Sequence, residues 1–271
     1  MNKFVKDLTD DVAFRSYFTS LNVVGDAVGD FKGAWKKIKA HHPSLAKDPS
    51  IIESFISLKN NPLFSEMGLT EDIIAQISGT VGLGYKEILD NLDNLGKKAA
   101  EKGIELEDFS KVVSDMIEGG GKVDGANWIT KYIGDKADDF AGKKLKFEEY
   151  NRSEFGGRYV DVTDITDDGF KIFYEFKSVS KVPPGHFQAQ FMKDLSAAFD
   201  LDQIKWIFNP SKNPVGDAGK TFREAMLSEI DKLPLTDDLA RKLLPDISSP
   251  TVNKLRQEII DQFDEIFELA N

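Results

Sequence analysis

Residues 158–177 read RYVDVTDITDDGFKIFYEFK, and this stretch decides the fold class of the second half of the chain. Polar and apolar residues alternate on both sides of its centre, and β-branched and aromatic residues dominate both runs. The segment TDDG between the runs (residues 166–169) has the composition of a tight turn. The stretch therefore predicts two antiparallel strands, over 158–165 and 170–177.

The length of the turn decides which residues of the two strands face each other. If the loop has three residues and Gly169 supplies a positive φ, Asp161 lies directly opposite Glu175. Lys177 then shares their face, because side chains alternate along a strand. A two-residue loop would shift the pairing by one position and place Val160 opposite Glu175.

Two carboxylates that face each other across a hairpin repel, by about 1 kcal/mol, and call for a compensating cation. Asp161 and Glu175 offer hard oxygen ligands suited to Mg²⁺ or Mn²⁺. Lys177 would then orient an attacking water or stabilise a phosphorane-like charge. On the same argument, Glu175→Ala would relieve the repulsion and raise the melting temperature in metal-free buffer.

The segments around the hairpin predict an α/β unit. Residues 138–150 are expected to form a helix, and residues 186–199 form an amphipathic pattern with phenylalanines on one face. Residues 204–208 (IKWIF) predict a short buried strand. The expected order is helix, strands, helix, strand, with a mixed sheet of about four strands.

The segments before and after this unit predict helices. From about residue 11 to residue 136, apolar residues recur at three- and four-residue spacing. We therefore expect an all-α domain over 1–136 and a sheet-containing domain over 137–271, which ends in a helical tail. Three helices are expected in the tail, over 221–233, 236–244 and 250–269, the last with Ser249 as its N-cap.

The composition narrows the possible functions. The chain has 271 residues, of which 41% are hydrophobic, so wholesale disorder is excluded. The absence of cysteine removes disulfides, thiolate zinc sites, iron–sulfur clusters and cysteine nucleophiles. No stretch approaches the roughly 18 apolar residues of a membrane span, and the first twenty residues lack a classical secretion signal.

The charge distribution locates the segment most suited to a polyanion. The net charge of -11 argues against a general nucleic-acid coat protein. Residues 142–220 hold twelve basic and twelve acidic residues, so the whole negative excess lies outside them. If any part of the chain binds a polyanion, it is this neutral middle segment that is expected to do so.

Asp161, followed after the hairpin by Glu175-Phe176-Lys177, resembles the signature of the PD-(D/E)xK nucleases. Val160 stands where that signature has proline, which is a departure from it. The resemblance implies a restriction-endonuclease-like αβββαβ core. It also implies a metal-dependent endonuclease, a phosphodiesterase, that cleaves DNA or RNA.

The family often carries a Glu on its first helix and a Gln on the helix after the ExK strand. Glu148 and Glu149 compete for the first role, and helical spacing from Leu145 favours Glu148. Gln190 and Gln188 compete for the second. The resemblance thus implies a metal held by Asp161, Glu175 and Glu148, with Lys177 and Gln190 completing the catalytic set. The expected contacts to the substrate backbone are basic residues of the same segment, Arg152, Arg158, Lys181 and Lys193.

Residues 174–184 (YEFKSVSKVPP), with the helical region around Trp128 upstream, are similar to toxin tips of bacterial polymorphic-toxin systems. That resemblance implies secretion as the tip of a larger toxin, activity in the target-cell cytoplasm and a cognate immunity protein; otherwise a cytoplasmic location is expected. Two alternatives stay open: a non-catalytic binding module on a nuclease-like scaffold, and a housekeeping repair nuclease.

Overall fold

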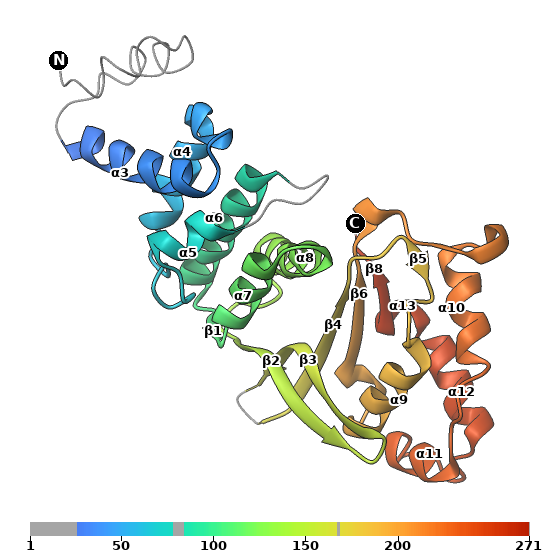
Figure 1. Cartoon of the computed structure of the whole chain (residues 1–271). Coiled ribbons are helices and arrows are strands. Elements are labelled where there is room, and N and C mark those ends of the chain that lie inside the picture. Colours follow the sequence, from blue (N-terminus) through green and yellow to red (C-terminus); the bar gives the residue numbers. More distant parts are fainter. Residues whose placement is uncertain (1–25, 78–83, 167–168, 271) are drawn as a thin grey trace. The chain divides into compact units, whose positions relative to one another are not determined.

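The chain divides into two compact units (Figure 1). The first unit comprises residues 1–104 and 109–142, and the second comprises residues 105–108 and 143–271. The computed structural model describes residues 26–77, 84–166 and 169–270.

The first unit is helical throughout its described residues, as the sequence predicts. Thr70 begins one helix as its N-cap, since its hydroxyl accepts a hydrogen bond of 3.2 Å from the N–H of Ile73. α6, the longest helix among the described residues, buries Leu89 and Leu92 completely and ends at Gly103, whose φ of 67° suits a left-handed C-cap. Residues 11–25 of the predicted helical half lie outside the described residues. The helices are α3 (Asp26–His41), α4 (Pro49–Lys59), α5 (Glu71–Gln76), α6 (Tyr85–Lys102), α7 (Ser110–Glu118) and α8 (Gly121–Asp135).

The second unit is built on a mixed sheet, which confirms the α/β class. Within the described residues the sheet has six strands in the order β1-β2-β3-β4-β6-β8, rather than about four. β2, β3 and β4 are antiparallel neighbours, whereas β1 runs parallel to β2, β6 to β4 and β8 to β6. The strands are β1 (Glu105–Glu107), β2 (Lys144–Ser153), β3 (Gly156–Ile165), β4 (Lys171–Lys177), β6 (Ile204–Phe208) and β8 (Phe267–Leu269).

The hairpin of β3 and β4 has the predicted three-residue loop. The N–H of Gly169 donates to the carbonyl of Thr166 at 2.9 Å, and Gly169 has a φ of 85°. Asp167 and Asp168, which complete the loop, lie outside the described residues. The resulting register pairs Val162 with Tyr174, so Asp161 and Glu175 occupy the next positions along the two strands.

The predicted helix over 138–150 is wrong, because residues 144–153 form β2. Leu145 and Phe147 are fully buried, while the lysines next to them are half-buried, which is the period of two of a strand. Pairing with the whole length of β3 outweighs the helical propensity of the segment KKLKFEE.

A helix and a short strand follow β4, as predicted, with β6 over the expected residues. α9 (Phe187–Ala197) packs on one face of the sheet, where Phe187 and Phe191 contact the indole of Trp206 edge-on. Trp206 lies in β6 and is completely buried. This tightly packed aromatic core thus fixes α9 on the sheet.

The C-terminal tail is helical except at its end. Thr251, rather than Ser249, is the N-cap of the penultimate helix, and its hydroxyl accepts a bond of 3.4 Å from the N–H of Lys254. The predicted helix over 250–269 is wrong in its last residues, because Phe267 is buried against the core aromatics and begins the edge strand β8. The helices are α10 (Phe222–Ile230), α11 (Asp237–Leu243), α12 (Val252–Asp261) and α13 (Phe263–Ile266).

Across the described ranges, every helix is too short or too polar to span a membrane.

Candidate functional site

Glu175 and Lys177 lie on β4, on the face that α9 covers. In the parallel pairing of β4 with β6, Glu175 is aligned with the core residue Trp206. The side chains of Glu175 and Lys177 are only 7% and 13% exposed. The pair is thus a buried charged group rather than part of a solvated strand face.

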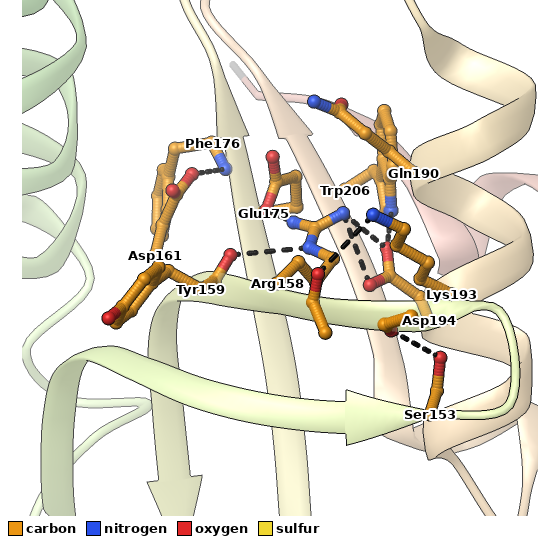
Figure 2. Close-up of polar contacts among 12 residues, drawn as sticks. Ser153, Arg158, Tyr159, Asp161, Glu175, Phe176, Gln190, Lys193, Asp194 and Trp206 are labelled. Carbon is orange, nitrogen blue, oxygen red and sulfur yellow. Dashed lines mark hydrogen bonds and ion pairs between the residues drawn. The ribbon is translucent and has the colours of Figure 1, made fainter.

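The carboxylate of Glu175 is held between two cations, Arg158 and Lys177, and Figure 2 shows Arg158 beside it. Its Oε2 accepts from the guanidinium of Arg158, and its Oε1 accepts from the ammonium of Lys177. Arg158 also contacts Asp194 at 3.2 Å, and Asp194 accepts a hydrogen bond of 3.0 Å from the indole N–H of Trp206. These side chains form one charge network between β3, β4, β6 and α9.

Lys177 has two further contacts. Its Nζ donates to the Oε1 of Gln190 at 3.1 Å and lies 4.8 Å from the ring centroid of Trp206. Burial lowers the pKa of Lys177, against the opposing effect of Asp161. Gln190 is therefore the glutamine at this site, whereas Gln188 donates to Glu229 at 2.7 Å.

Asp161 is half-buried and contacts the backbone of β4. Its Oδ2 accepts a hydrogen bond of 2.7 Å from the N–H of Phe176, as Figure 2 shows. The contact places the carboxylate between β3 and β4, next to the position of Glu175. Against the burial that lowers the pKa of Lys177, Asp161 acts to raise it, and the register of β3 and β4 places Asp161 level with Glu175.

Glu148 lies on β2 rather than on the predicted helix. Its φ of 50° is unusual for a residue other than glycine. The strand neighbours of Glu148 pair with the strand neighbours of Asp161, so the two acidic residues lie side by side in the sheet. Glu149 instead forms an ion pair of 2.8 Å with Lys171. Glu148, Asp161 and Glu175 therefore mark one row across β2, β3 and β4.

Asp194 is a site residue that the sequence analysis does not predict. Burial raises its pKa to about 6, against the opposing effects of Arg158 and the Trp206 hydrogen bond. Asp194 lies four residues after Gln190 on α9, and this spacing places both side chains on one helix face. The spacing is visible in the sequence and points to Asp194 once Gln190 is assigned to the site.

The four cations predicted to contact substrate occupy different environments. Arg158 is 11% exposed and pairs with Glu175 and Asp194 within the charge network. Arg152 is exposed on β2, and Lys181 is exposed 3.7 Å from Asp217. Lys193 on α9 donates to the carbonyl of Gly157 at 3.3 Å.

The donor chemistry of the row fits a hard divalent cation, because all three side chains are carboxylates. Among the residues that the structure describes, no three acidic or histidine side chains converge as a preformed metal site. Asp161 and Glu175 use oxygen atoms to accept protein hydrogen bonds. Metal binding would therefore exchange some of these contacts for metal–oxygen bonds.

Comparisons of the chain with models of known protein families, with curated proteins and with solved structures gave no match. The nuclease resemblance thus depends on the residues and geometry described above.

Proposed function

We propose that the second unit is a metal-dependent nuclease that hydrolyses phosphodiester bonds of DNA or RNA. The observation that carries this proposal is the row of Glu148, Asp161 and Glu175, with Lys177 two residues beyond on β4. Four carboxylate or amine groups of these types, on three adjacent strands, are suited to metal-assisted phosphoryl transfer.

The order of elements also supports the proposal. The strands β2, β3 and β4 form an antiparallel meander, and α9 then connects β4 to the parallel strand β6. Apart from the two-residue strand β5 (Lys181–Val182), the second unit thus holds the βββαβ part of the αβββαβ order that the resemblance implies, without the helix expected over 138–150. β1 and β8 would then be additions at the two edges of that core.

Asp161, Glu175 and Glu148 would hold Mg²⁺ or Mn²⁺, which when bound supplies Lewis-acid stabilisation of the phosphate charge and a more acidic water. Lys177 would orient the attacking water, and its lowered pKa brings the ammonium closer to the range in which it can exchange a proton. Gln190 positions Lys177 through their 3.1 Å hydrogen bond. Arg158 balances the charge of Glu175 and is in turn held by Asp194.

A cleavage assay tests the proposal. Plasmid DNA and transfer RNA are each incubated with the protein in Mg²⁺ or Mn²⁺, with and without EDTA. We expect cleavage of at least one substrate, its loss in EDTA, and its loss in Lys177→Ala. Lys171→Ala is the matched control, because Lys171 lies on the same strand but pairs with Glu149. Cleavage that survives EDTA or Lys177→Ala, or a folded wild-type protein without any cleavage, would refute the proposal.

One observation favours a second candidate, a non-catalytic binding module on this scaffold. Arg158 and Lys177 already compensate both oxygens of Glu175, so the buried charges can be purely structural. A well-folded wild-type protein that binds nucleic acid but cleaves neither substrate would favour this candidate.

For the biological role we propose a bacterial toxin tip, exported within a larger polypeptide and held inactive in its producer by an immunity protein. Inducible expression in a bacterial host tests this role. We expect growth arrest with degraded nucleic acid, abolished by Asp161→Ala. Normal growth with a soluble, active nuclease would instead indicate a housekeeping repair enzyme.

A further inference from the structure

The hairpin of β2 and β3 continues beyond the part of the sheet where β3 pairs with β4. The pairing of β3 with β4 covers residues 162–165, whereas its pairing with β2 extends to the end of the hairpin, where Ser153 pairs with Gly156. We call residues 149–160 the hairpin arm. Figure 1 shows β2 and β3 as the two long strands of this hairpin.

The arm carries two strongly exposed tyrosines that face each other. Tyr150 on β2 pairs with Tyr159 on β3, and their ring centroids are 5.2 Å apart with the rings inclined by 60°. The two residues are 57% and 59% exposed, although a tyrosine ring is largely apolar. A fixed pair of exposed aromatic rings is more typical of a binding surface than of a solvated strand.

Gly157 provides the space that Tyr150 occupies. A Cβ atom at Gly157 would lie 2.0 Å from the hydroxyl oxygen of Tyr150, so the phenol ring lies against this glycine. Arg152 is the strand partner of Gly157 and shares the face of Tyr150 by strand alternation. Arg152 is exposed and, among the described residues, has no ion-pair partner. One face of the arm thus combines two aromatic rings with an open guanidinium.

We propose that this face, formed by Tyr150, Tyr159 and Arg152, binds single-stranded nucleic acid through its unpaired bases. Aromatic side chains stack on exposed bases of any sequence, while an arginine contacts the phosphate backbone. Bases within an intact duplex are stacked on one another and offer no free ring face. The chain as a whole carries a net charge of -11. A face with an exposed arginine and two aromatic rings therefore favours binding of a polyanion over binding of a second copy of this chain.

The face lies on the opposite side of the sheet from the charge network. Arg158, next to Tyr159 on β3, points to Glu175 and Asp194 on the side that α9 covers, so strand alternation turns Tyr159 to the other side. Nucleic acid stacked on the tyrosines would therefore lie along the hairpin arm on the side away from Glu175 and Lys177. The inference rests on the proposed nuclease function in one respect, because it names the substrate class of that site as nucleic acid with unpaired bases.

Binding without catalysis tests the inference. Labelled single-stranded DNA and RNA of about 12 nucleotides, and the matched DNA duplex, are titrated with full-length protein in EDTA by fluorescence anisotropy. We expect the single strands to bind at least about tenfold more tightly than the duplex. Tyr150→Ala and Tyr159→Ala should each weaken single-strand binding by about 5- to 150-fold, the range for loss of one stacked base. Tyr159→Phe should retain the binding.

Phe199→Ala is the matched control, because Phe199 is 72% exposed but lies outside the arm; it should bind like wild type. Equal affinity for duplex and single strand, unchanged binding by both Tyr→Ala variants, or binding of another protein in place of nucleic acid would overturn the inference. Circular dichroism checks that each variant is folded. If an Ala variant is not folded, Tyr159→Phe, which keeps the ring and removes only the hydroxyl, tests whether the ring is sufficient for binding. A protein that binds single strands through the tyrosines but cleaves nothing would refute only the nuclease proposal.

Discussion

Glu175→Ala is expected to destabilise the second unit in metal-free buffer. The repulsion argument from the sequence predicts the opposite, because it places Glu175 opposite Asp161 without a partner. In the structure both oxygens of Glu175 are bound by the cations of Arg158 and Lys177. Removing the carboxylate therefore leaves two buried positive charges with less compensation.

The size of the effect follows from the burial of the three side chains. Glu175, Arg158 and Lys177 are 7%, 11% and 13% exposed, so solvent screens their interactions little. Removing one partner of a buried ion pair lowers the free energy of unfolding by about 3–5 kcal/mol. Arg158 retains Asp194 as a second partner, so we expect the lower end, about 3 kcal/mol. At about 4 °C per kcal/mol for a unit of this size, the melting temperature should fall by about 12 °C.

Urea and thermal unfolding in EDTA measure this change, with Asp264→Ala as the control. Asp264 pairs with Arg223, and their side chains are 83% and 46% exposed, so its loss should change the free energy of unfolding by no more than about 1 kcal/mol. A Glu175→Ala protein as stable as wild type, or more stable, would refute the reasoning. Repulsion from Asp161 would then outweigh the two ion pairs.

Three further predictions concern the same unit. Burial raises the pKa of Asp194 to about 6, so the protonated carboxyl stabilises the fold at low pH, and this contribution is lost as the pH rises through about 6. In urea titrations, the unfolding free energy of Asp194→Asn minus that of wild type should therefore grow between about pH 4 and pH 7. A difference that stays constant over this pH range would contradict the prediction. Phe267→Ala should lower the unfolding free energy by about 3–5 kcal/mol, because the ring is buried among Phe191, Trp206 and Phe263, and a loss below about 1 kcal/mol would argue against β8. Gly157→Ala should displace the exposed ring of Tyr150 and weaken single-strand binding, while it changes the unfolding free energy by less than about 1 kcal/mol; unchanged binding in anisotropy would contradict the placement of that ring.

The parts of the fold that can be predicted from the sequence are those determined by local patterns. The alternation in residues 158–177 and the positive φ of Gly169 determine the hairpin and its register. The strand over Ile204–Phe208 is a short apolar run, and turn residues follow it directly in the sequence. The position of Asp161 beside Glu175 follows from that register, so the amino-acid sequence alone predicts this part of the candidate site.

The remaining features depend on contacts between distant residues. The segment of Glu148 has helix-forming residues, and only its pairing with β3 makes it a strand. Phe267 ends a helical pattern but completes the aromatic core beside Trp206, which turns the last residues into β8. Arg158 reaches Asp194 across 36 positions of sequence, and no local pattern indicates that this cation points into the site rather than toward substrate.

Mn²⁺ binding by the purified protein tests the central claim most directly, because it examines the carboxylate row itself. Isothermal titration calorimetry would compare wild type with Asp161→Asn and Glu175→Gln, with Glu149→Gln as the control from the same sheet. We predict that wild type and Glu149→Gln bind Mn²⁺ equally, and that each of the two other variants binds at least about tenfold more weakly. Wild-type affinity in Asp161→Asn and Glu175→Gln, or no Mn²⁺ binding by the folded wild-type protein, would contradict the account.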